Sequence, residues 1–463
     1  MLLHDTARIL EDKIKRMALN IVWLSFIIIP LLALLVVGTD PAAFAAFLSA
    51  LVLLSPVWLP VFLIVILWIA WIQYIRHKFW YTSDMVVIYI QPPPEITKSP
   101  HAMEIFLTAL FHTGSETTFL NRVWQGRFRN TWSIELASVE GRVGFYMHLR
   151  RMWKDSIETR LYGQYPEAKI TEVEDYIAKI PFNLEEYDMW CGEFGKQAIK
   201  PGAAPVKTYI DFGLDKDTDT PETTVDPIIN MLEILSSLGK DEYAWMQIIM
   251  RAHAKEDYFG FYRFGDPFKK EAEEYIRGKI ASAAKRAKEI AAEQLMADET
   301  QQAQIAGRGM TMLTEEEKNE IAAIERNMNK PVYECGLRVC YVAKKERFRG
   351  INGAFFYRFF DGVWGPYNRI AGIPGRGLIG FDYPWEDPLK FRKSRMKELL
   401  YFHSKHRAFF YVPYDQKHEY FSTEELATIW HFPDSSVQTP GLERVAARRA
   451  EAPANLPVQT QEE

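Results

Sequence analysis

Two long apolar segments near the N-terminus constrain the fold more than any other feature of the chain. Residues 17–38 contain no ionisable side chain, and apolar sequence resumes at Ala42 and continues to Ile75. About 20 apolar residues are enough to cross the hydrocarbon core of a bilayer. The second segment is longer than one crossing needs and contains Pro56 and Pro60, so we expect a kink, a steep tilt or a short interfacial helix before the span. The sequence therefore predicts a two-helix transmembrane hairpin.

The charges around this hairpin predict its orientation. The connecting loop contains no lysine or arginine. Lysine and arginine flank the hairpin on both outer sides: Arg8, Lys13, Lys15, Arg16, Arg76 and Lys78. The positive-inside rule then places residues 1–16, the soluble region and both termini in the cytoplasm, as in a multi-pass protein of the cell inner (plasma) membrane. A cleaved signal peptide or a buried core hairpin is the alternative, but a signal peptide has a shorter apolar core and no second span directly after it.

Residues 84–180 predict a first α+β module. Strand patterns and helix patterns alternate in the order β-α-β-β-α-β, which is that of a ferredoxin-like fold. The expected strands are residues 85–90, 132–139, 142–149 and 169–173, and the expected helices carry apolar residues from Ala102 to Leu110 and from Trp153 to Leu161.

The same order recurs over residues 200–373, which predicts a second ferredoxin-like module. Its expected strands are residues 207–212, 243–252, 332–342 and 368–373, with a helix capped by Asp226 and an aromatic helix from Phe355 to Val363. A helical insertion at 266–330 interrupts it. Residues 374–440 are expected to form a C-terminal accessory region and residues 441–463 a flexible tail.

The insertion has the pattern of a coiled-coil-like helical hairpin. Its apolar residues step by four and three along one helix: Ile276, Ile280, Ala283, Ala287 and Ile290. Thr314 and Glu317 form a capping box for a second helix. A partner-binding arm and a solvated helix packed on its own module are both compatible with this pattern.

Charge and cysteine content exclude little. A net charge of -5 gives no whole-chain electrostatic reason to expect nucleic-acid binding. The three cysteines, Cys191, Cys335 and Cys340, are expected to be free thiols in a reducing compartment. Cys335 and Cys340 lie five residues apart in a strand pattern, so they should point to opposite faces.

Four groups of residues were weighed as candidate sites, and none carries a convincing motif. The glycines Gly372, Gly375, Gly377 and Gly380 lack the Gly-Lys-Ser/Thr ending of a P-loop and predict a loop. His403 and His406 have a spacing used by metal sites, but no cysteine or carboxylate cluster adjoins them, so exposed side chains are expected. The remaining two groups are acidic and basic: Glu172, Glu174 and Asp175, and Arg392, Lys393, Arg395 and Lys397.

The acids are expected to be solvated at a strand end, and the basic cluster to be a solvated helix face, although it suits phosphates of lipid or DNA. The sequence therefore predicts no catalytic, cofactor-binding or metal-binding residue, and a protein that is not an enzyme.

Several segments resemble an uncharacterised bacterial family. They are SPHAMEIFLTALFHTG from Ser99, WSIELASVEGRVGFYMHLR from Trp132, ETRLYGQYPEAKITEVEDY ending at Tyr176, VKTYIDFGLDK from Val206, WMQIIMRAH from Trp245 and FSTEELATIWHFP from Phe421. In that family they form the membrane-proximal region that precedes a hexameric P-loop ATPase of the type IV secretion or conjugation coupling class, similar to DNA-translocating helicases.

No residue of a nucleotide site can be carried over from this resemblance, because the sequence reaches Glu463 where such an ATPase would begin. The ATPase is then expected on a separate polypeptide, or as a lost domain. The resemblance implies a non-enzymatic, membrane-anchored platform of a type IV secretion or conjugation-like system, which docks the ATPase, meets nucleic acid only indirectly and is compatible with a homo-oligomer. The alternatives are a membrane-bound enzyme with a site between the two modules, and a nucleic-acid-binding module that uses open sheet faces.

Overall fold

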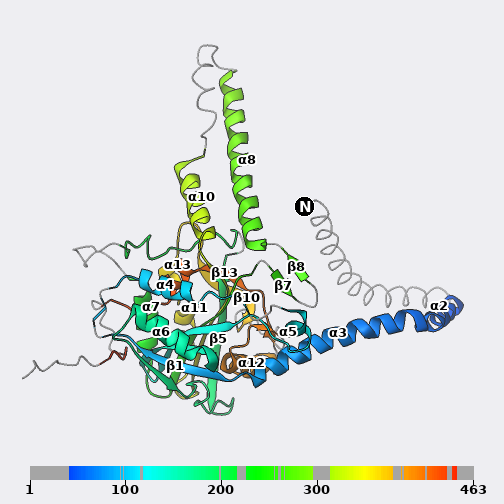
Figure 1. The fold of residues 1–463 in the computed structure, drawn as a ribbon, viewed down its shortest axis with the longest axis horizontal. Helices are drawn as coiled ribbons and strands as arrows, with labels where there is room; N and C mark the ends of the chain where they lie inside the picture. Colours follow the sequence, from blue (N-terminus) through cyan, green and yellow to red (C-terminus); the bar gives the residue numbers. More distant parts are fainter. Residues whose placement is uncertain are drawn as a thin grey trace, which may run out of the picture. The chain divides into compact units, whose positions relative to one another are not determined.

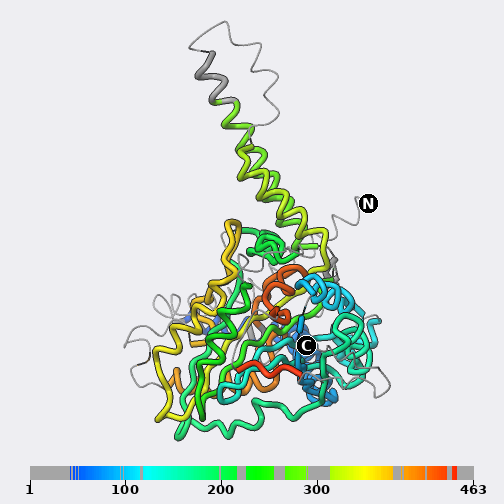
Figure 2. Tube along the Cα trace, turned by 90° about the vertical axis from the view of Figure 1, so that its left-hand side faces the viewer, coloured from blue at the N-terminus to red at the C-terminus, as the bar shows by residue number. Residues whose placement is uncertain are grey.

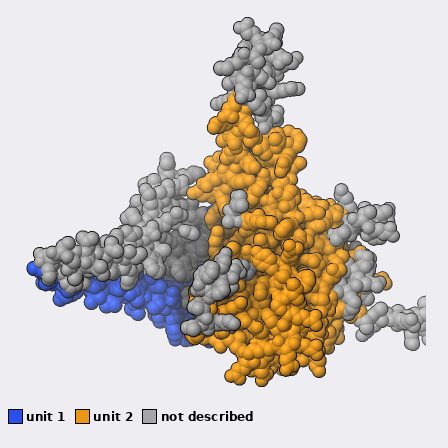
Figure 3. Space-filling view, turned by 180° about the vertical axis from the view of Figure 1, so that it is seen from behind, with its two compact units in different colours: residues 1–82, 115–128, 254–266 blue, residues 83–114, 129–253, 267–463 orange. Residues whose placement is uncertain are grey.

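A computed structural model describes most of the chain from Pro41 onward. The described residues are 41–93, 95–96, 98–114, 118–197, 200–215, 226–254, 256–258, 262–264, 266–295, 313–378, 387, 391–411, 414–434 and 441–445. They divide into two compact units (Figure 3). Unit 1 contains residues 1–82, 115–128 and 254–266, and unit 2 contains residues 83–114, 129–253 and 267–463.

Unit 1 is built around one long apolar helix. Its described elements are α2 (Pro41–Leu53), α3 (Ser55–Thr82), α5 (Phe119–Val123), β7 (Glu256–Tyr258) and β8 (Tyr262–Phe264). The predicted first span at residues 17–38 lies outside the described residues.

The prediction of a multi-pass membrane protein is wrong. Among the described residues, only α3 is long and apolar enough to cross a membrane, and it is almost entirely exposed. The apolar run at 42–75 is divided at Leu54 into α2 and α3. The preceding helix α2 has 13 residues, which at 1.5 Å per residue reach about 20 Å and fall short of a hydrocarbon core of about 30 Å. The predicted location, a multi-pass protein of the inner membrane with both termini in the cytoplasm, is therefore also wrong.

Unit 2 is a mixed α+β structure with one large antiparallel sheet. The nine strands of this sheet are β1 (Met85–Gln91), β2 (Thr131–Val139), β3 (Arg142–Arg150), β4 (Lys169–Val173), β5 (Tyr187–Lys196), β6 (Glu242–Ala252), β9 (Val332–Lys344), β10 (Ile370–Gly377) and β13 (Glu419–Ser422). The order is β10-β5-β9-β6-β2-β3-β1-β4, and β13 also pairs with β9. The short strands β11 (Phe410–Tyr411) and β12 (Tyr414–Asp415) form a separate ribbon.

The sheet contains the same four-strand arrangement twice. In each group the first strand lies between the third and the fourth, and the second strand follows the third: β4-β1-β3-β2 and β10-β5-β9-β6. The two groups join where β2 pairs with β6 along nine residues, from Thr131 opposite Arg251 to Val139 opposite Tyr243. One continuous sheet therefore connects the two halves of unit 2.

The predicted strands of the first group are confirmed within one residue at each end. Glu140 and Gly141 both have positive φ in the turn between β2 and β3, as a tight hairpin requires. In the second group the predicted strand at 207–212 is wrong, because residues 209–215 form turns. The first strand of this group is β5, which the sequence pattern did not reveal. Its burial depends on partners that are distant in sequence.

Unit 2 contains eight helices and two 3-10 turns among its described residues. They are α4 (His101–Ala109), α6 (Lys154–Gln164), α7 (Ile228–Ser236), α8 (Pro267–Leu295), α10 (Glu315–Met328), α11 (Gly350–Tyr357), α12 (Phe391–His406) and α13 (Thr423–Ile429), with the 3-10 turns η1 (Arg151–Trp153) and η3 (Asp361–Val363). Helices α4, α6, α7, α11 and α13 lie together against the sheet (Figure 1). Their apolar residues form one core with alternate residues of the strands, such as Ile88, Ile134 and Ile248. Burial of these side chains at about 25 cal/mol per Å² is the main stabilising contribution of this layer.

The opposite face of the sheet is covered by C-terminal residues. Leu400 of α12 packs with Trp245 and Cys340, and Phe409 and Phe410 pack on Ile249. The region predicted as an accessory segment therefore completes both sides of the core, since Leu426 and Trp430 lie in the helix layer.

The cysteines do not all match the prediction of free thiols. Cys191 of β5 and Cys340 of β9 are directly opposite in the sheet and form a disulfide. Cys335 is buried and free. Cys335 and Cys340 do point to opposite faces, since they belong to different clusters of the core.

Helices α8 and α10 form an arm that projects from the sheet (Figure 2). The capping box of Thr314 and Glu317 is confirmed, and Glu317 also accepts two hydrogen bonds of 2.7 Å from Arg286 of α8. At the sheet, Phe268 and Ala272 of α8 and Ile324 of α10 bury themselves against Ala204 and Val332. The predicted helical insertion is thus present as two packed helices in its described part.

Candidate functional site at the base of the arm

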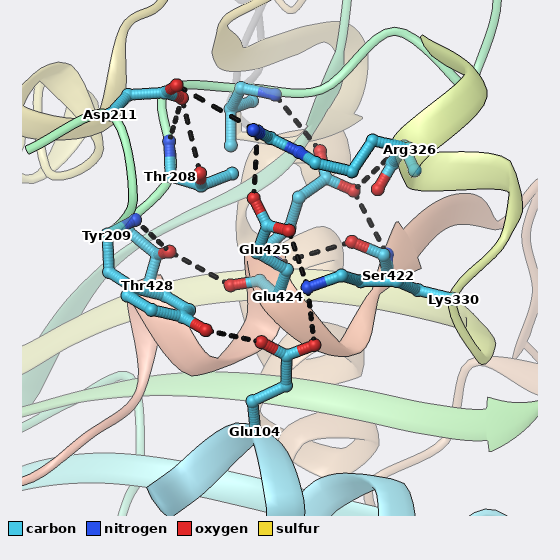
Figure 4. Close-up of polar contacts among 12 residues, drawn as sticks. Glu104, Thr208, Tyr209, Asp211, Arg326, Lys330, Ser422, Glu424, Glu425 and Thr428 are labelled. Atoms are coloured by element: carbon cyan, nitrogen blue, oxygen red, sulfur yellow. Dashed lines mark hydrogen bonds and ion pairs between the residues drawn. The ribbon is translucent and has the colours of Figure 1, made fainter. Parts of the chain in front are cut away.

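A buried network of charged residues holds the base of the arm, which here means the C-terminal end of α10 and residues up to Lys330. Figure 4 shows side chains of α4, the loop at 208–211, α10 with Lys330, and the start of α13 converging there. Lys196 of β5 joins them through Glu425.

Lys330 links the two halves of the sheet through their helices. Its Nζ lies 2.7 Å from Glu104 Oε1 on α4 and 2.6 Å from Glu424 Oε2 on α13. The other oxygen of Glu424 lies 3.0 Å from Arg326 Nη2 on α10. The Glu104 and Glu424 side chains are 7% and 2% exposed, so the two carboxylates are held in a poorly hydrated place where ion pairs are strengthened.

A second pair lies deeper. Lys196 of β5 and Glu425 of α13 are 1% and 0% exposed, and their charged atoms are 2.7 Å apart. Glu425 also accepts hydrogen bonds from the backbone N–H groups of Val206 and Ser422, each at 3.0 Å. Its bond to Ser422 is half of the capping box that begins α13. Asn327 of α10 donates to the same carboxylate at 3.3 Å.

Tyr209 closes the network on the side of α4. Its hydroxyl donates to Glu104 Oε2 at 2.5 Å, and its backbone N–H donates to Thr428 of α13 at 2.9 Å. Burial, followed by the hydrogen bond to Glu104, raises the pKa of Tyr209 far above its ordinary value. The hydroxyl therefore stays a proton donor at any physiological pH.

Glu320 of α10, which lies closer to the start of this helix than Arg326, also joins several cationic and polar side chains. It contacts Lys200, accepts a hydrogen bond of 2.9 Å from Tyr275 and lies 3.1 Å from Lys279. Burial opposes its ionisation, but the hydrogen bonds from Lys200, Tyr275 and Lys279 lower its pKa overall. The arm is therefore tied to the loop at 200–211 and to its own other helix by the same carboxylate.

The charged groups that connect α10 and Lys330 with α4, α13 and β5 are equal in number and opposite in sign. Three carboxylates, Glu104, Glu424 and Glu425, are matched by three cations, Arg326, Lys330 and Lys196. Such a network fixes relative positions, because removing one partner leaves a buried charge uncompensated. In the described part of the chain, no group of three or more His, Cys, Asp or Glu side chains is arranged to hold a metal ion.

A second polar network lies on the other face of the sheet. Glu193, Arg338, Gln247 and Glu135 are consecutive cross-strand neighbours on β5, β9, β6 and β2. Arg338 Nη2 donates to Glu193 Oε1 at 3.0 Å, and Arg407, after α12, binds Glu135 through both Nε and Nη2.

Residues 401–411 and 414–416 cover this polar row. Tyr414 donates to Glu193 at 2.6 Å, and Gln247 donates to the Ser404 carbonyl at 3.0 Å. The middle of the sheet is therefore not an open platform on which bases of a nucleic acid could stack.

The two histidines considered as a metal pair, His403 and His406, have different surroundings. His403 is buried, contrary to the prediction, and stacks on Tyr414 with ring centroids 4.3 Å apart. Burial, followed by the charge of Arg338, lowers its pKa to about 4. His406 faces its own helix and bonds to the Phe402 carbonyl at 2.9 Å.

The acidic residues weighed as solvated groups have cationic partners. Glu172 accepts from Arg151 and Lys154, and Glu174 is exposed and lies 3.5 Å from Lys179. Asp175 binds the buried Arg407. Burial opposes ionisation of Asp175, but the charge of Arg407 lowers its pKa overall.

The basic cluster lies on α12, as expected for a helix face. Arg392, Lys393 and Arg395 are exposed, and Lys397 pairs with Asp188. The glycine-rich stretch is not a loop: Gly372, Gly375 and Gly377 belong to edge strand β10, whose register with β5 shifts between Gly372 and Gly377. Gly380 lies outside the described residues.

The residues at the base of the arm were missed by the sequence analysis. Their only local signals are a glutamate within the apolar stripe of α4 and the Ser-x-x-Glu pattern at Ser422 and Glu425. No protein-family model matches the chain. No curated protein matches it either.

Proposed function

We propose that the protein is a non-enzymatic, membrane-associated platform of a type IV secretion or conjugation-like system, and that its helical arm docks a separately encoded P-loop ATPase. The proposal combines the resemblance of the chain with the geometry at the base of the arm. Its catalytic role is nil; it positions a partner.

The observation that carries the proposal is the charge network beneath the arm. Arg326 and Asn327 at the end of α10, together with Lys330 just after it, engage α4 and α13 at once. The carboxylate of Glu425, to which Asn327 donates, also pairs with Lys196 of β5. A projecting pair of helices on a flexible joint would lose orientational freedom when it binds a partner, and this loss costs entropy. An arm that is already fixed avoids that cost.

The surface of α8 suits a contact with another helical protein. Ile280 is an apolar side chain that is 49% exposed in mid-helix, and Arg277 beside it is 71% exposed. An apolar residue surrounded by charged neighbours is the usual centre of a small interface.

Helix α3 supports membrane association through one segment. Its exposed side chains from Val57 to Ile69 are almost all large and apolar, and such a surface is unfavourable in water. We propose that α3 enters a bilayer, which confines the platform and raises its effective concentration near a membrane-bound partner.

We further propose that the two four-strand groups are ferredoxin-like modules joined edge to edge. The order β4-β1-β3-β2 with antiparallel neighbours supports this for the first group, and β10-β5-β9-β6 supports it for the second. The second module then begins at β5 rather than at residue 200.

The proposal is tested by affinity purification of the full chain from its own cell in mild detergent, with mass spectrometry and an ATP-hydrolysis assay of the complex. The wild-type protein should retain a P-loop ATPase, and hydrolysis should disappear when that partner is removed. Ile280→Asp should lose the partner, while Ala281→Asp, an exposed neighbour on a different side of α8, should keep it.

Two outcomes would refute the proposal. A wild-type preparation that contains no P-loop ATPase would remove the platform function. Retention of the ATPase by Ile280→Asp at the wild-type level would show that the arm is not the docking element.

A further inference from the structure

We propose that α5 is a second membrane contact, which inserts Phe119, Leu120 and Trp124 into the headgroup region of an anionic bilayer beside α3. This inference rests on the membrane association proposed for α3, and it assigns the depth, the orientation and the lipid class of that association.

The three side chains form an exposed apolar surface on a short segment. Phe119 is 61%, Leu120 65% and Trp124 70% exposed. Thr118 caps the helix by accepting from the Asn121 N–H at 3.2 Å, which holds the first turn of α5 in place. Exposed phenylalanine, leucine and tryptophan side chains on a short helix are typical of interfacial membrane contacts.

Contacts within unit 1 fix this surface to α3. Trp71 Nε1 of α3 donates to the Val123 carbonyl of α5 at 2.8 Å, and the rings of Trp71 and Trp124 lie 5.5 Å apart. Val123 packs with Ile72 and Ile75. Gly126 has φ +66°, and a Cβ there would lie 2.3 Å from the Ile75 carbonyl oxygen, so only glycine permits this approach.

The level of the contact along α3 is the level at which a bilayer would end. The helix is apolar and exposed up to Leu67, and its first lysine or arginine follows at Arg76. Trp68, Trp71 and Tyr74 lie between these two positions, as in the aromatic belts of membrane proteins. Since α5 packs at Trp71 to Ile75, its apolar side chains lie at this boundary.

The charges of the two segments point to an anionic surface. Residues 41–82 and 118–128 contain no aspartate or glutamate, whereas they contain four cations: Arg76, Lys78, Arg122 and Arg127. Lys78 and Arg127 are exposed. Cations close to a membrane surface favour anionic lipids, so the charge complements a bilayer rather than another apolar protein face.

Two membrane contacts on one rigid unit have a mechanical consequence. A single helix leaves a protein free to tilt and rotate about its axis, because only its length is matched to the bilayer. A second contact at the interface, fixed to the side of the same helix, removes this rotation.

The test is depth-dependent quenching on the full-length protein. Single cysteines are introduced as Trp124→Cys and, within α3, as Val61→Cys, and each is labelled with an environment-sensitive fluorophore. The protein is reconstituted in vesicles of phosphatidylcholine, with or without phosphatidylglycerol, that carry a nitroxide either near the headgroup or near the chain end.

The label at position 124 should lose fluorescence with the shallow nitroxide, and more so with phosphatidylglycerol. The label at position 61 should be quenched by the deep nitroxide. Arg127→Gln should reduce the effect of phosphatidylglycerol at position 124. Phe119→Ser with Leu120→Ser should reduce shallow quenching there, while Met152→Ser, which removes an exposed apolar side chain of unit 2, should leave it unchanged.

The possible failures are distinguishable. Quenching at position 61 without quenching at position 124 would overturn the role of α5 and leave the anchor intact. Absence of quenching at both positions would overturn the inference together with the membrane association itself.

Discussion

The buried pair of Lys196 and Glu425 should contribute strongly to stability, and Lys196→Met is the perturbation that tests this. The charged atoms lie 2.7 Å apart and both side chains are essentially unexposed. Methionine keeps an apolar chain next to the Phe421 ring, which lies 4.8 Å from the ammonium group in the wild type. The variant therefore removes the charge with little loss of packing.

The expected cost follows from the geometry. At an effective dielectric constant of about 20, two charges 2.7 Å apart attract by about 6 kcal/mol. Glu425 keeps the hydrogen bonds from Val206, Ser422 and Asn327 in the variant, which offset part of this loss. We expect the free energy of unfolding to fall by about 3 kcal/mol, near the lower end for breaking a buried pair.

Urea unfolding of the detergent-solubilised protein measures this change. With a slope of about 3 kcal/mol per M, the midpoint should fall by about 1 M. Lys285→Met is the matched control, because Lys285 is 79% exposed and 3.7 Å from Glu289; such a pair contributes about 0.5 kcal/mol or less. Adding Glu425→Gln to Lys196→Met should recover part of the loss, since no buried charge then remains without a partner.

Equal midpoints for Lys196→Met and Lys285→Met would refute the reasoning. So would strict additivity of Lys196→Met and Glu425→Gln, because residues in direct contact should show a coupling energy in a double-mutant cycle. Either result would mean that the hydrogen bonds, and not the ion pair, hold the base of the arm.

Three further predictions concern a glycine and two histidines. Gly126→Ala should destabilise unit 1 by about 1–3 kcal/mol because of its positive φ and the Ile75 carbonyl, whereas Gly163→Ala, which has open space around it, should be neutral or slightly stabilising in urea unfolding. Burial opposes charging of His431, but Asp226 raises the pKa of His431 overall. The ion pair of His431 and Asp226 therefore contributes fully to the free energy of unfolding below about pH 6.5, and this contribution is lost as the pH rises through the raised pKa. The difference in urea midpoint between wild type and Asp226→Asn should shrink at alkaline pH. The pKa of His403 is lowered to about 4, so stability should instead fall as the pH drops from about 6.5, and His403→Gln should flatten this acid loss.

The sequence predicts those parts of the fold that are specified locally. Strands β1 to β4, β6 and β9 have apolar patterns that are readable over a few residues, and the capping box at Thr314 is a local signal. Strand β5 was missed because Gly192, Glu193 and Gly195 interrupt its apolar pattern. Its polar residue is buried only because Arg338 of β9 lies opposite.

The base of the arm could not be predicted for a related reason. Glu104 and Lys330 are 226 residues apart, and Lys196 and Glu425 are 229 apart. Single charged residues in helical patterns are usually exposed, so nothing local marks these four as buried partners. The long separation also explains why the strand predicted at 207–212 is wrong: the backbone N–H of Tyr209 in this loop donates to Thr428, and that of the preceding Val206 donates to Glu425.

The polar row on the sheet gives the junction between the two halves a fixed register. Glu135 of β2 and Gln247 of β6 are opposite each other at this junction, and Arg338 and Glu193 continue the row. A slip of β6 by one residue would move Gln247 into the apolar helix layer and Met246 onto Arg407 and Glu135, because side chains alternate between faces. Burial of an unpaired amide and loss of the neighbouring hydrogen bonds would penalise that register. Apolar residues alone would not discriminate as sharply, since Met246, Ile248, Ile249 and Met250 are all buried. The buried polar residues thus select one alignment of the two halves, and with it the relative positions of Glu104 on α4 and Glu424 on α13 that the base of the arm requires.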